Sequence, residues 1–251
     1  MKIAAIIPAR YASSRFPGKP LADLGGKSLI QRVYERISDF PWTFLTVATD
    51  HDAIFQHVKA FGGQVQMTQS HHQTGTDRCA EVAKDWPNID LVVNIQGDEP
   101  FIQLSDIQIL LDLFVQHPST QIATLAKRIR QTSDLFNPNI VKVVLKANQQ
   151  AAYFSRQAIP YQRDLPQQSW LDGSQAYFRH IGLYAFRRET LLRVAALPPS
   201  SLEQSEVLEQ LRWLEQGYTI SVGETTHESF GIDQPEDVAK ALQRLKEQSK
   251  P

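Results

Sequence analysis

The chain has 251 residues, a formal net charge of −1 and a single cysteine, Cys79. This charge balance gives no overall attraction to nucleic acid or to an anionic membrane, and one cysteine excludes an intrachain disulfide and the cysteine-rich zinc modules. No uncharged apolar stretch approaches the ~18 residues that a membrane-spanning helix needs, and Met1 and Lys2 lead directly into an apolar run without a signal-peptide pattern. We therefore expect a cytoplasmic globular protein with no membrane insertion and no nucleic-acid partner.

Strand and helix patterns alternate through the first 120 residues. Short apolar runs predict strands at 3–7, 44–48, 65–67 and 91–95. Amphipathic or helix-capped segments predict helices at 28–40, 52–61, 76–86 and 106–117. This alternation predicts an α/β fold in which a parallel sheet has helices on both faces.

The pattern changes after about residue 120. Strands are predicted at 122–127, 140–145, 152–155 and 181–186, with few helices between them. Two final helices are predicted, one at 202–216 and one that starts at Pro235 and extends to Lys246. The second half therefore predicts mixed or antiparallel additions to the sheet.

A basic loop follows the first predicted strand. It carries Arg10, Arg15 and Lys19, with no carboxylate before Asp23. Three cations on one loop repel each other, so the arrangement predicts a bound polyanion, and a triphosphate at the carboxyl end of a parallel strand is the obvious candidate. The alternative is a solvated basic surface loop, although the Pro17–Gly18 pair restrains its path.

Asp98 lies beside Gly97 just after the apolar strand at 91–95. A carboxylate in this position suits a Mg²⁺ ion held over bound phosphates, because magnesium takes hard oxygen ligands and only one or two of them from protein. In the alternative, Asp98 only caps the turn that follows the strand.

Asp233 has a similar pair of interpretations. If Pro235 is the first helical residue, the cap position falls on Gln234, which is a poor cap, and Asp233 stays free for another task. A shift of one residue would instead make Asp233 the cap itself.

Further polar residues have weaker patterns. Arg78 lies one turn into the predicted helix at 76–86, where it binds phosphate or a base edge, or forms a surface charge pair with Asp77. Arg156, Arg163 and His180 gather around later strand ends, which predicts a second anionic ligand, although a histidine on a strand is more often a hydrogen-bonded structural residue. Glu209 and Gln210 lie on a predicted helix and point either inward or outward.

Segments from end to end of the chain match the motifs of one known family: 7–21, 96–100, 136–139, 153–156, 179–182, 208–212 and 233–237. On these segments the chain resembles the CMP-KDO synthetase family, the 3-deoxy-manno-octulosonate cytidylyltransferases. The sequence departs from the common family pattern at Phe16, Asp77 and Gln234, where leucine, glutamate and threonine are usual, and at Ser14, where threonine is usual. None of these departures removes a charged group.

The resemblance implies a three-layer α/β sandwich of the nucleotide-diphospho-sugar-transferase type, as a single nucleotidyltransferase domain over residues 1–251. Residues 1–120 would be its nucleotide-binding half, and 121–251 its sugar-binding and dimerisation half. The implied reaction belongs to lipopolysaccharide precursor synthesis. The 2-hydroxyl of KDO attacks the α-phosphorus of CTP to give CMP-KDO and pyrophosphate, in a Mg²⁺-dependent homodimer.

The site residues that the resemblance implies fall into four groups. The nucleotide-binding residues are Pro8, Ala9, Arg10, Ser14, Arg15, Lys19, Arg78 and Gln96. The catalytic residues are Arg15, Lys19 and Asp98, and the metal ligands are Asp98 and Asp233. The sugar-binding residues are Gln96, Arg156, Arg163, His180, Tyr184, Glu209 and Gln210, with Arg156, Arg163 and His180 as the charged donors to the sugar carboxylate.

Two alternatives stay open from the sequence. The chain is a related CMP-sugar synthetase, of the 8-amino-KDO or sialate type, which would differ at the sugar-side residues Arg156 and His180. Or it is a non-catalytic nucleotide-binding regulator on the same fold, which would have no need for two separate aspartates.

Overall fold

The computed structural model describes residues 1–12, 15–173 and 175–248. The chain forms two compact units, one of Met1–Leu104 with Ser229–Pro251 and the other of Ser105–Glu228. The C-terminal segment thus belongs with the N-terminal unit, whereas the sequence predicts a single division of the chain, at residue 120. The assignment of a nucleotide half and a sugar half stays a prediction.

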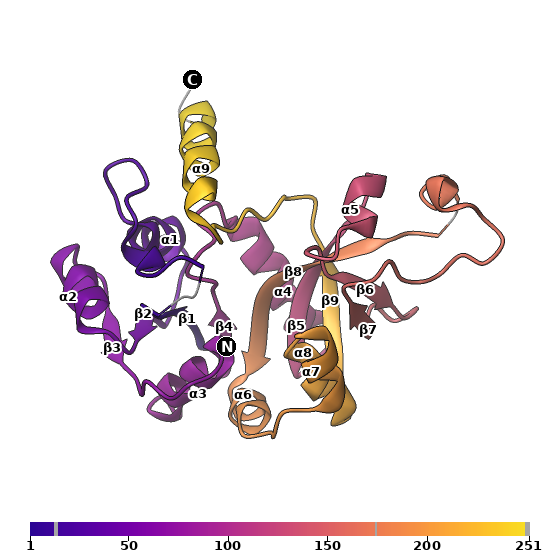
Figure 1. Ribbon diagram of the computed structural model, residues 1–251. Helices are drawn as coiled ribbons and strands as arrows, with labels where there is room; N and C mark the ends of the chain where they lie inside the picture. The colour runs from indigo at the N-terminus through magenta and orange to yellow at the C-terminus, as the bar shows by residue number, and fades with distance from the viewer. Residues whose placement is uncertain (13–14, 174, 249–251) are drawn as a thin grey trace. The chain divides into compact units, whose positions relative to one another are not determined.

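The first unit contains four parallel strands in the order β3-β2-β1-β4 (Figure 1). They are β1 (Ile3–Ala9), β2 (Phe44–Thr49), β3 (Val65–Met67) and β4 (Leu91–Asn94). The chain moves outward from β1 to β3 and then returns to the opposite side of β1 with β4. The carboxyl ends of β1 and β4 therefore form a topological switch point, which is where open α/β sheets bind their ligands.

Helices lie on both sides of these strands, as the alternating pattern predicts. They are α1 (Leu29–Ser38), α2 (Asp52–Ala60), α3 (Gly75–Lys84) and α9 (Pro235–Gln248), with the short 3-10 helix η1 (Lys19–Leu21). Figure 1 shows α1 and α3 on opposite sides of β1 and β2. Ser28 caps α1 by accepting a hydrogen bond from the Gln31 N–H, and the apolar face of α1 is buried. The predicted α/β class is confirmed.

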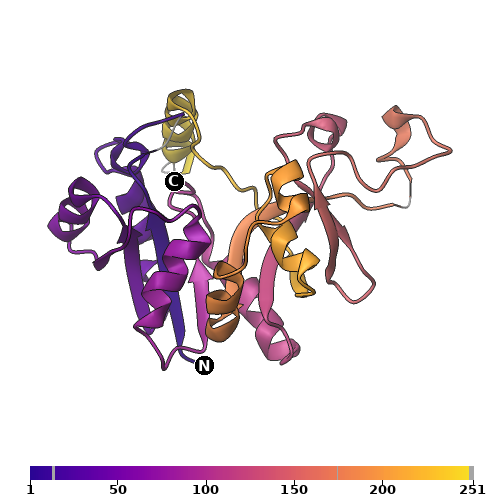
Figure 2. The same cartoon turned by 60° about the horizontal axis from the view of Figure 1, so that its bottom comes forward.

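The second unit is built around β5 (Ile122–Arg128). This strand pairs antiparallel with β8 (Phe178–Arg187) and parallel with β9 (Ile220–Glu224) (Figure 1), and Figure 2 shows β8 beside β5 from another side. A hairpin of β6 (Lys142–Leu145) and β7 (Ala151–Ser155) joins it through antiparallel pairing of β6 with β8. The predicted antiparallel additions in the second half are confirmed.

The helices of the second unit correct one prediction. They are α4 (Leu104–Gln116), α5 (Thr132–Phe136), α6 (Arg188–Ala195), α7 (Ser201–Glu206) and α8 (Gln210–Glu215), with the 3-10 helix η2 (Gln167–Ser169). The single helix predicted over 202–216 is two helices, because Val207 adopts the left-handed conformation, with φ of 53°, and turns the chain. Among the residues that the structure describes, no helix is long and apolar enough to cross a membrane.

Candidate functional site

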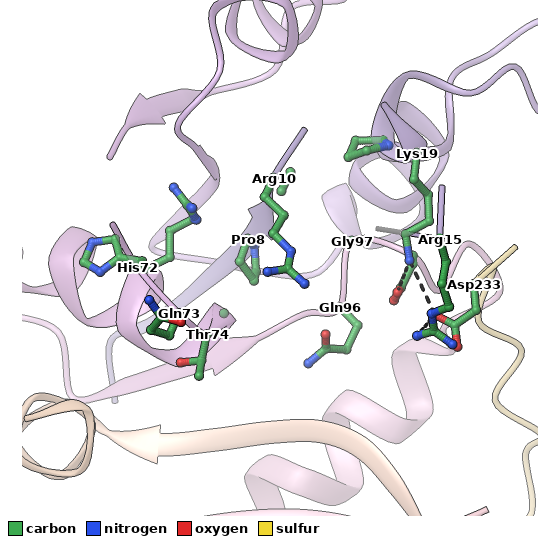
Figure 3. Close-up of a pocket in the computed structure, with 15 residues that line it drawn as sticks. Pro8, Arg10, Arg15, Lys19, His72, Gln73, Thr74, Gln96, Gly97 and Asp233 are labelled. Carbon is green, nitrogen blue, oxygen red and sulfur yellow. Dashed lines mark hydrogen bonds and ion pairs between the residues drawn. The ribbon is translucent and has the colours of Figure 1, made fainter. Parts of the chain in front are cut away.

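A pocket lies at the carboxyl ends of β1 and β4 and has a volume of about 340 Å³ (Figure 3). Its lining residues all belong to the first unit: Pro8, Ala9, Arg10, Arg15, Lys19, Pro20, His72, Gln73, Thr74, Gly75, Arg78, Gln96, Gly97, Asp98 and Asp233. These include every residue predicted for the nucleotide or the metal except Ser14, which lies outside the described residues. Elements distant in sequence therefore meet where the strand order predicts a ligand.

Gly97 allows the close backbone packing beneath this pocket. A Cβ atom on Gly97 would lie 2.9 Å from the carbonyl oxygen of Pro8, closer than real Cβ atoms approach a backbone oxygen. Any larger residue would push apart the end of β1 and the segment that follows β4. The glycine therefore fixes the spacing between the end of β1, after which the basic loop begins, and the residues that follow β4.

The N-terminus of α3 forms another wall of the pocket. Thr74 caps the helix by accepting a hydrogen bond from the Asp77 N–H, and the Asp77 carboxylate accepts one from the Thr74 N–H, at 3.1 and 3.0 Å. Asp77 thus completes a capping box despite being shorter than the usual glutamate. The helix dipole favours an anion at this end of α3.

The charged side chains of the pocket pair across it. Lys19 Nζ lies 2.7 Å from Asp98 Oδ2 and 3.7 Å from Asp233 Oδ1, and Arg15 Nη2 lies 3.4 Å from the same oxygen of Asp233 (Figure 3). Arg10 extends into the space between Pro8 and Gln96 (Figure 3), and within the described residues its guanidinium has no hydrogen bond or ion pair. The structure therefore brings the basic loop and both predicted metal-binding aspartates to one place.

Arg78 is buried rather than exposed. Its guanidinium donates to Asp50 Oδ2 at 2.8 Å, to the Thr68 hydroxyl and to the carbonyl of Gln69. The alternative of a surface charge pair with Asp77 is wrong, because Arg78 is 3% exposed and the Asp77 carboxylate accepts a hydrogen bond from the Thr74 N–H in the capping box. Arg78 holds the ends of β2 and β3 together while it lines the pocket.

Asp233 lies just outside α9, which begins at Pro235 as predicted. The Asp237 carboxylate accepts hydrogen bonds from the N–H groups of Asp233 and Gln234, at 3.1 and 3.0 Å. Partial burial raises the pKa of Asp237, but these hydrogen bonds lower it by more, so the pKa lies below its ordinary value. Because Asp237 satisfies the helix end, the Asp233 carboxylate is not needed as a cap and faces Arg15 and Lys19.

The sugar-side residues other than Gln96 lie in the second unit. His180 and Tyr184 have ring centroids 5.3 Å apart, and the Phe154 and Trp213 rings pack edge-on against them. Burial and the nearby charge of Glu209 raise the pKa of Tyr184 well above its ordinary value, so its phenol is neutral. The structure therefore brings His180, Tyr184 and Glu209 together.

His180 does not supply the positive charge that is predicted for it from the sequence. Burial lowers the pKa of His180 to about 3, so its imidazole is neutral near pH 7. Its Nε2 lies 2.9 Å from the Thr124 hydroxyl, which itself donates to backbone carbonyls of β8. Thr124 can therefore accept from His180 Nε2–H, which leaves Nδ1 as an acceptor.

The lowered pKa of His180 gives a pH dependence of stability. At His180 the unfolded chain binds a proton below about pH 6.5, whereas the folded chain binds one only below about pH 3. Between these values the free energy of unfolding therefore decreases as the pH is lowered. When the pH is lowered from 7 to 5, we expect the free energy of unfolding of wild type to fall by about 2 kcal/mol more than that of a His180→Gln variant. Urea unfolding of both proteins at the two pH values measures this difference, and equal losses would contradict the buried neutral state.

Arg156 is held by backbone carbonyls. Its guanidinium donates to the carbonyls of Glu206, Val207 and Pro138 at 2.7, 3.4 and 3.2 Å, and its backbone N–H donates to the Glu206 carboxylate at 2.9 Å. Three of its five N–H groups are thereby used, and two are left for a ligand. These contacts hold the turn between α7 and α8 and so position Glu209 and Gln210, of which Gln210 is buried.

Arg163 lies exposed in the segment between β7 and η2, and the described part of the chain gives it no hydrogen bond or ion pair. The structure therefore does not bring it into the cluster of His180, Tyr184 and Glu209.

Several pocket residues were not predicted: Pro20, His72, Gln73, Thr74, Gly75 and Gly97. The spacing Thr74-x-x-Asp77 is a capping-box signature that marks the start of α3. This signature is the sequence feature from which the pocket wall at the N-terminus of α3 could be predicted. His72 gives no comparable signal, because its position depends on a hydrogen bond to Glu81 on α3.

Comparison with known proteins gives consistent results over nearly the whole chain. The family model described as cytidylyltransferase matches residues 4–221. The 3-deoxy-manno-octulosonate cytidylyltransferase of Parabacteroides distasonis is 54% identical over 96% of this chain and 97% of its own length, and that of Phocaeicola vulgatus is 53% identical over 98% of each. A solved CMP:2-keto-3-deoxy-manno-octonic acid synthetase in complex with CTP superposes with a TM-score of 0.91, at 40% identity over 99% of this chain and all of that one.

Proposed function

Because the chain belongs to the 3-deoxy-manno-octulosonate cytidylyltransferase family, we propose that it transfers the cytidylyl group of CTP to KDO and releases pyrophosphate. The main support for the proposal is that one pocket at the switch point of the sheet contains three cations, two aspartates and the N-terminus of α3. The charged residues are Arg10, Arg15, Lys19, Asp98 and Asp233. A triphosphate matches this combination of charge and shape, and the similar solved structure binds CTP.

The reaction forms a bond between the KDO 2-hydroxyl oxygen and the α-phosphorus, and it breaks the bond between that phosphorus and the bridging oxygen of pyrophosphate. Phosphoryl transfer depends mainly on positioning and on neutralising charge. Arg15 and Lys19 would hold the β- and γ-phosphates and stabilise the negative charge of the departing pyrophosphate. The Arg10 guanidinium, which projects into the middle of the pocket, would contact the nucleotide phosphates as well.

Asp98 and Asp233 fit a Mg²⁺ site on one structural criterion. Their oxygens lie 2.7 and 3.7 Å from the same ammonium nitrogen of Lys19, so a single cation reaches both. Carboxylate oxygens are the ligands that magnesium prefers. Asp98 and Asp233 would hold this ion, whose positive charge would lower the pKa of the attacking sugar hydroxyl and offset charge on the phosphate oxygens.

The KDO carboxylate would be received in the second unit. Arg156 keeps two N–H groups that its backbone contacts do not use, and a planar guanidinium can grip a carboxylate with two parallel bonds. The sugar hydroxyls would form hydrogen bonds with side chains that carry no positive charge: His180, Tyr184, Glu209 and Gln210. The resemblance also supports Arg163 and Gln96 as sugar contacts, and a homodimer in the cytoplasm that supplies a lipopolysaccharide precursor.

A substrate panel tests the proposal. Purified protein with CTP and Mg²⁺ should release pyrophosphate with KDO and not with N-acetylneuraminate, and the 8-amino form of KDO tests the nearest alternative. Pyrophosphate release with the sialate alone would support the sialate-type alternative. CTP binding without release with any of the three sugars would support the regulator.

The two aspartates around Gln234 should separate function from stability. Asp233→Asn removes a proposed metal ligand, so we expect turnover to fall by ~10²-fold, on the scale of one preorganised electrostatic group, with little change in Tm. Asp237→Ala removes the helix cap, so we expect it to lose ~1 kcal/mol of stability and to keep most activity. Thermal unfolding and turnover of both variants check this, and a purely structural loss in Asp233→Asn would show that Asp233 is a cap.

A further inference from the structure

Lys19 is the intramolecular partner of both proposed metal ligands. Its ammonium contacts Asp98 at 2.7 Å and Asp233 at 3.7 Å, so it competes with any cation that would bind both carboxylates (Figure 3). Two cations, Lys19 and Arg15, and two carboxylates meet at this point, and their formal charges cancel. A divalent cation that entered alone would add two positive charges beside these two.

The two ion pairs that oppose such a cation differ in strength. The side chains of Lys19 and Asp98 are 15% and 29% exposed, whereas those of Arg15 and Asp233 are 62% and 55% exposed. Solvent and salt screen the exposed pair far more than the sheltered one. The contact between Lys19 and Asp98 is therefore the main competitor for a metal ion.

We propose that Lys19 is an internal counter-ion that keeps Asp98 and Asp233 from holding a divalent metal until a triphosphate draws the lysine away. The inference rests on the proposed function, in which Lys19 and Arg15 bind the β- and γ-phosphates. Once these cations turn to the phosphates, both carboxylates lose their partners and their negative charge favours a metal. Metal and nucleotide binding are then coupled through one side chain, which would limit binding of free metal in the absence of substrate.

Metal binding without nucleotide tests this directly. Mn²⁺ shares the oxygen-ligand preference of Mg²⁺, and its unbound fraction can be measured by electron paramagnetic resonance. The Lys19→Met variant keeps the stem of the side chain and removes its charge. We expect Mn²⁺ to bind this variant more tightly than wild type, by about tenfold or more, on the scale of losing one charged competitor.

Lys27→Met is the matched control. Lys27 forms an ion pair with Glu35 at 2.6 Å in the same unit and does not line the pocket. Its loss should leave Mn²⁺ affinity at the wild-type value. Lys19→Gln provides a second test if Lys19→Met does not fold, as judged by thermal unfolding.

The double variant Lys19→Met/Asp98→Asn shows whether the additional Mn²⁺ binding occurs at Asp98. We expect its Mn²⁺ affinity to return to about the wild-type value or lower. Unchanged Mn²⁺ affinity in both Lys19 variants, or a gain that survives in the double variant, would overturn the counter-ion role. Neither result depends on turnover, so failure of the proposed function would appear separately, as absence of product with CTP and KDO.

Discussion

Replacement of Asp98 by asparagine is expected to lower turnover at least ~10²-fold in saturating Mg²⁺ while the protein stays folded. Asparagine keeps the size of the side chain and much of its hydrogen bonding, but it removes the charge that would hold the metal. The Asp98 side chain is 29% exposed and its ion pair is with Lys19, so the change creates no cavity in the core. The expected loss is therefore one of chemistry and not of folding.

Steady-state rates with CTP and KDO measure this effect, and thermal unfolding confirms the fold. Asp85→Asn is the matched control, because Asp85 accepts a hydrogen bond from Gln66 in the same unit and does not line the pocket. Near-wild-type turnover in Asp98→Asn would mean that Asp98 only supports the turn after β4.

The second large effect concerns the distal phosphates. We expect Arg15→Ala and Lys19→Ala each to weaken CTP binding while affinity for CMP, which lacks those phosphates, stays close to wild type. A contact to a charged group contributes roughly 1.5–3 kcal/mol, which corresponds to about 10- to 150-fold in affinity. Arg15 is the more exposed of the two, so its loss should lie at the lower end.

Calorimetric titration with both nucleotides, in Mg²⁺ and in its absence, checks this expectation. Lys27→Ala serves as the surface control, since its partner Glu35 lies outside the pocket. Equal weakening toward CTP and CMP would show that the loop reads the base or the ribose and would remove the proposed role in pyrophosphate departure.

The first unit was predictable because its strands are short apolar runs and its chemistry lies at their carboxyl ends. The strand Ile3–Ala9 leads into the basic loop, and Leu91–Asn94 leads to Asp98. Parallel neighbours share one edge for their carboxyl ends, so the two motifs had to meet if the strands were adjacent. The exact partners of Lys19 could not be derived, because they depend on the path of the loop and on how α9 begins.

In the second unit, the structure could not be predicted from the sequence where contacts between distant residues override the local hydrophobic pattern. The apolar period over 202–216 is compatible with one helix, but Val207 takes a left-handed conformation that β-branched residues rarely adopt. Arg156, some fifty residues earlier, holds the carbonyls of Glu206 and Val207 at this turn. No local sequence signal carries that information.

Two other features show the same limit. Strand β9 contains Gly223, whose hydrogen leaves room for Ile109, since a Cβ there would lie 2.7 Å from that side chain. Glycine inside a short strand weakens the strand pattern, so the apolar runs of the sequence predict no strand at 220–224. The neutral state of His180 depends on burial against aromatic rings of β7 and β8, and the sequence shows only a histidine next to Arg179.

The most direct test of the central claim follows the phosphorus atoms of the substrate. In ³¹P NMR of the wild-type protein with CTP, KDO and Mg²⁺, we expect the three CTP signals to decline while pyrophosphate and a CMP-sugar phosphodiester grow in equal amounts. Unchanged CTP signals in the presence of KDO, or the appearance of CMP and pyrophosphate without the phosphodiester, would contradict the proposed cytidylyl transfer.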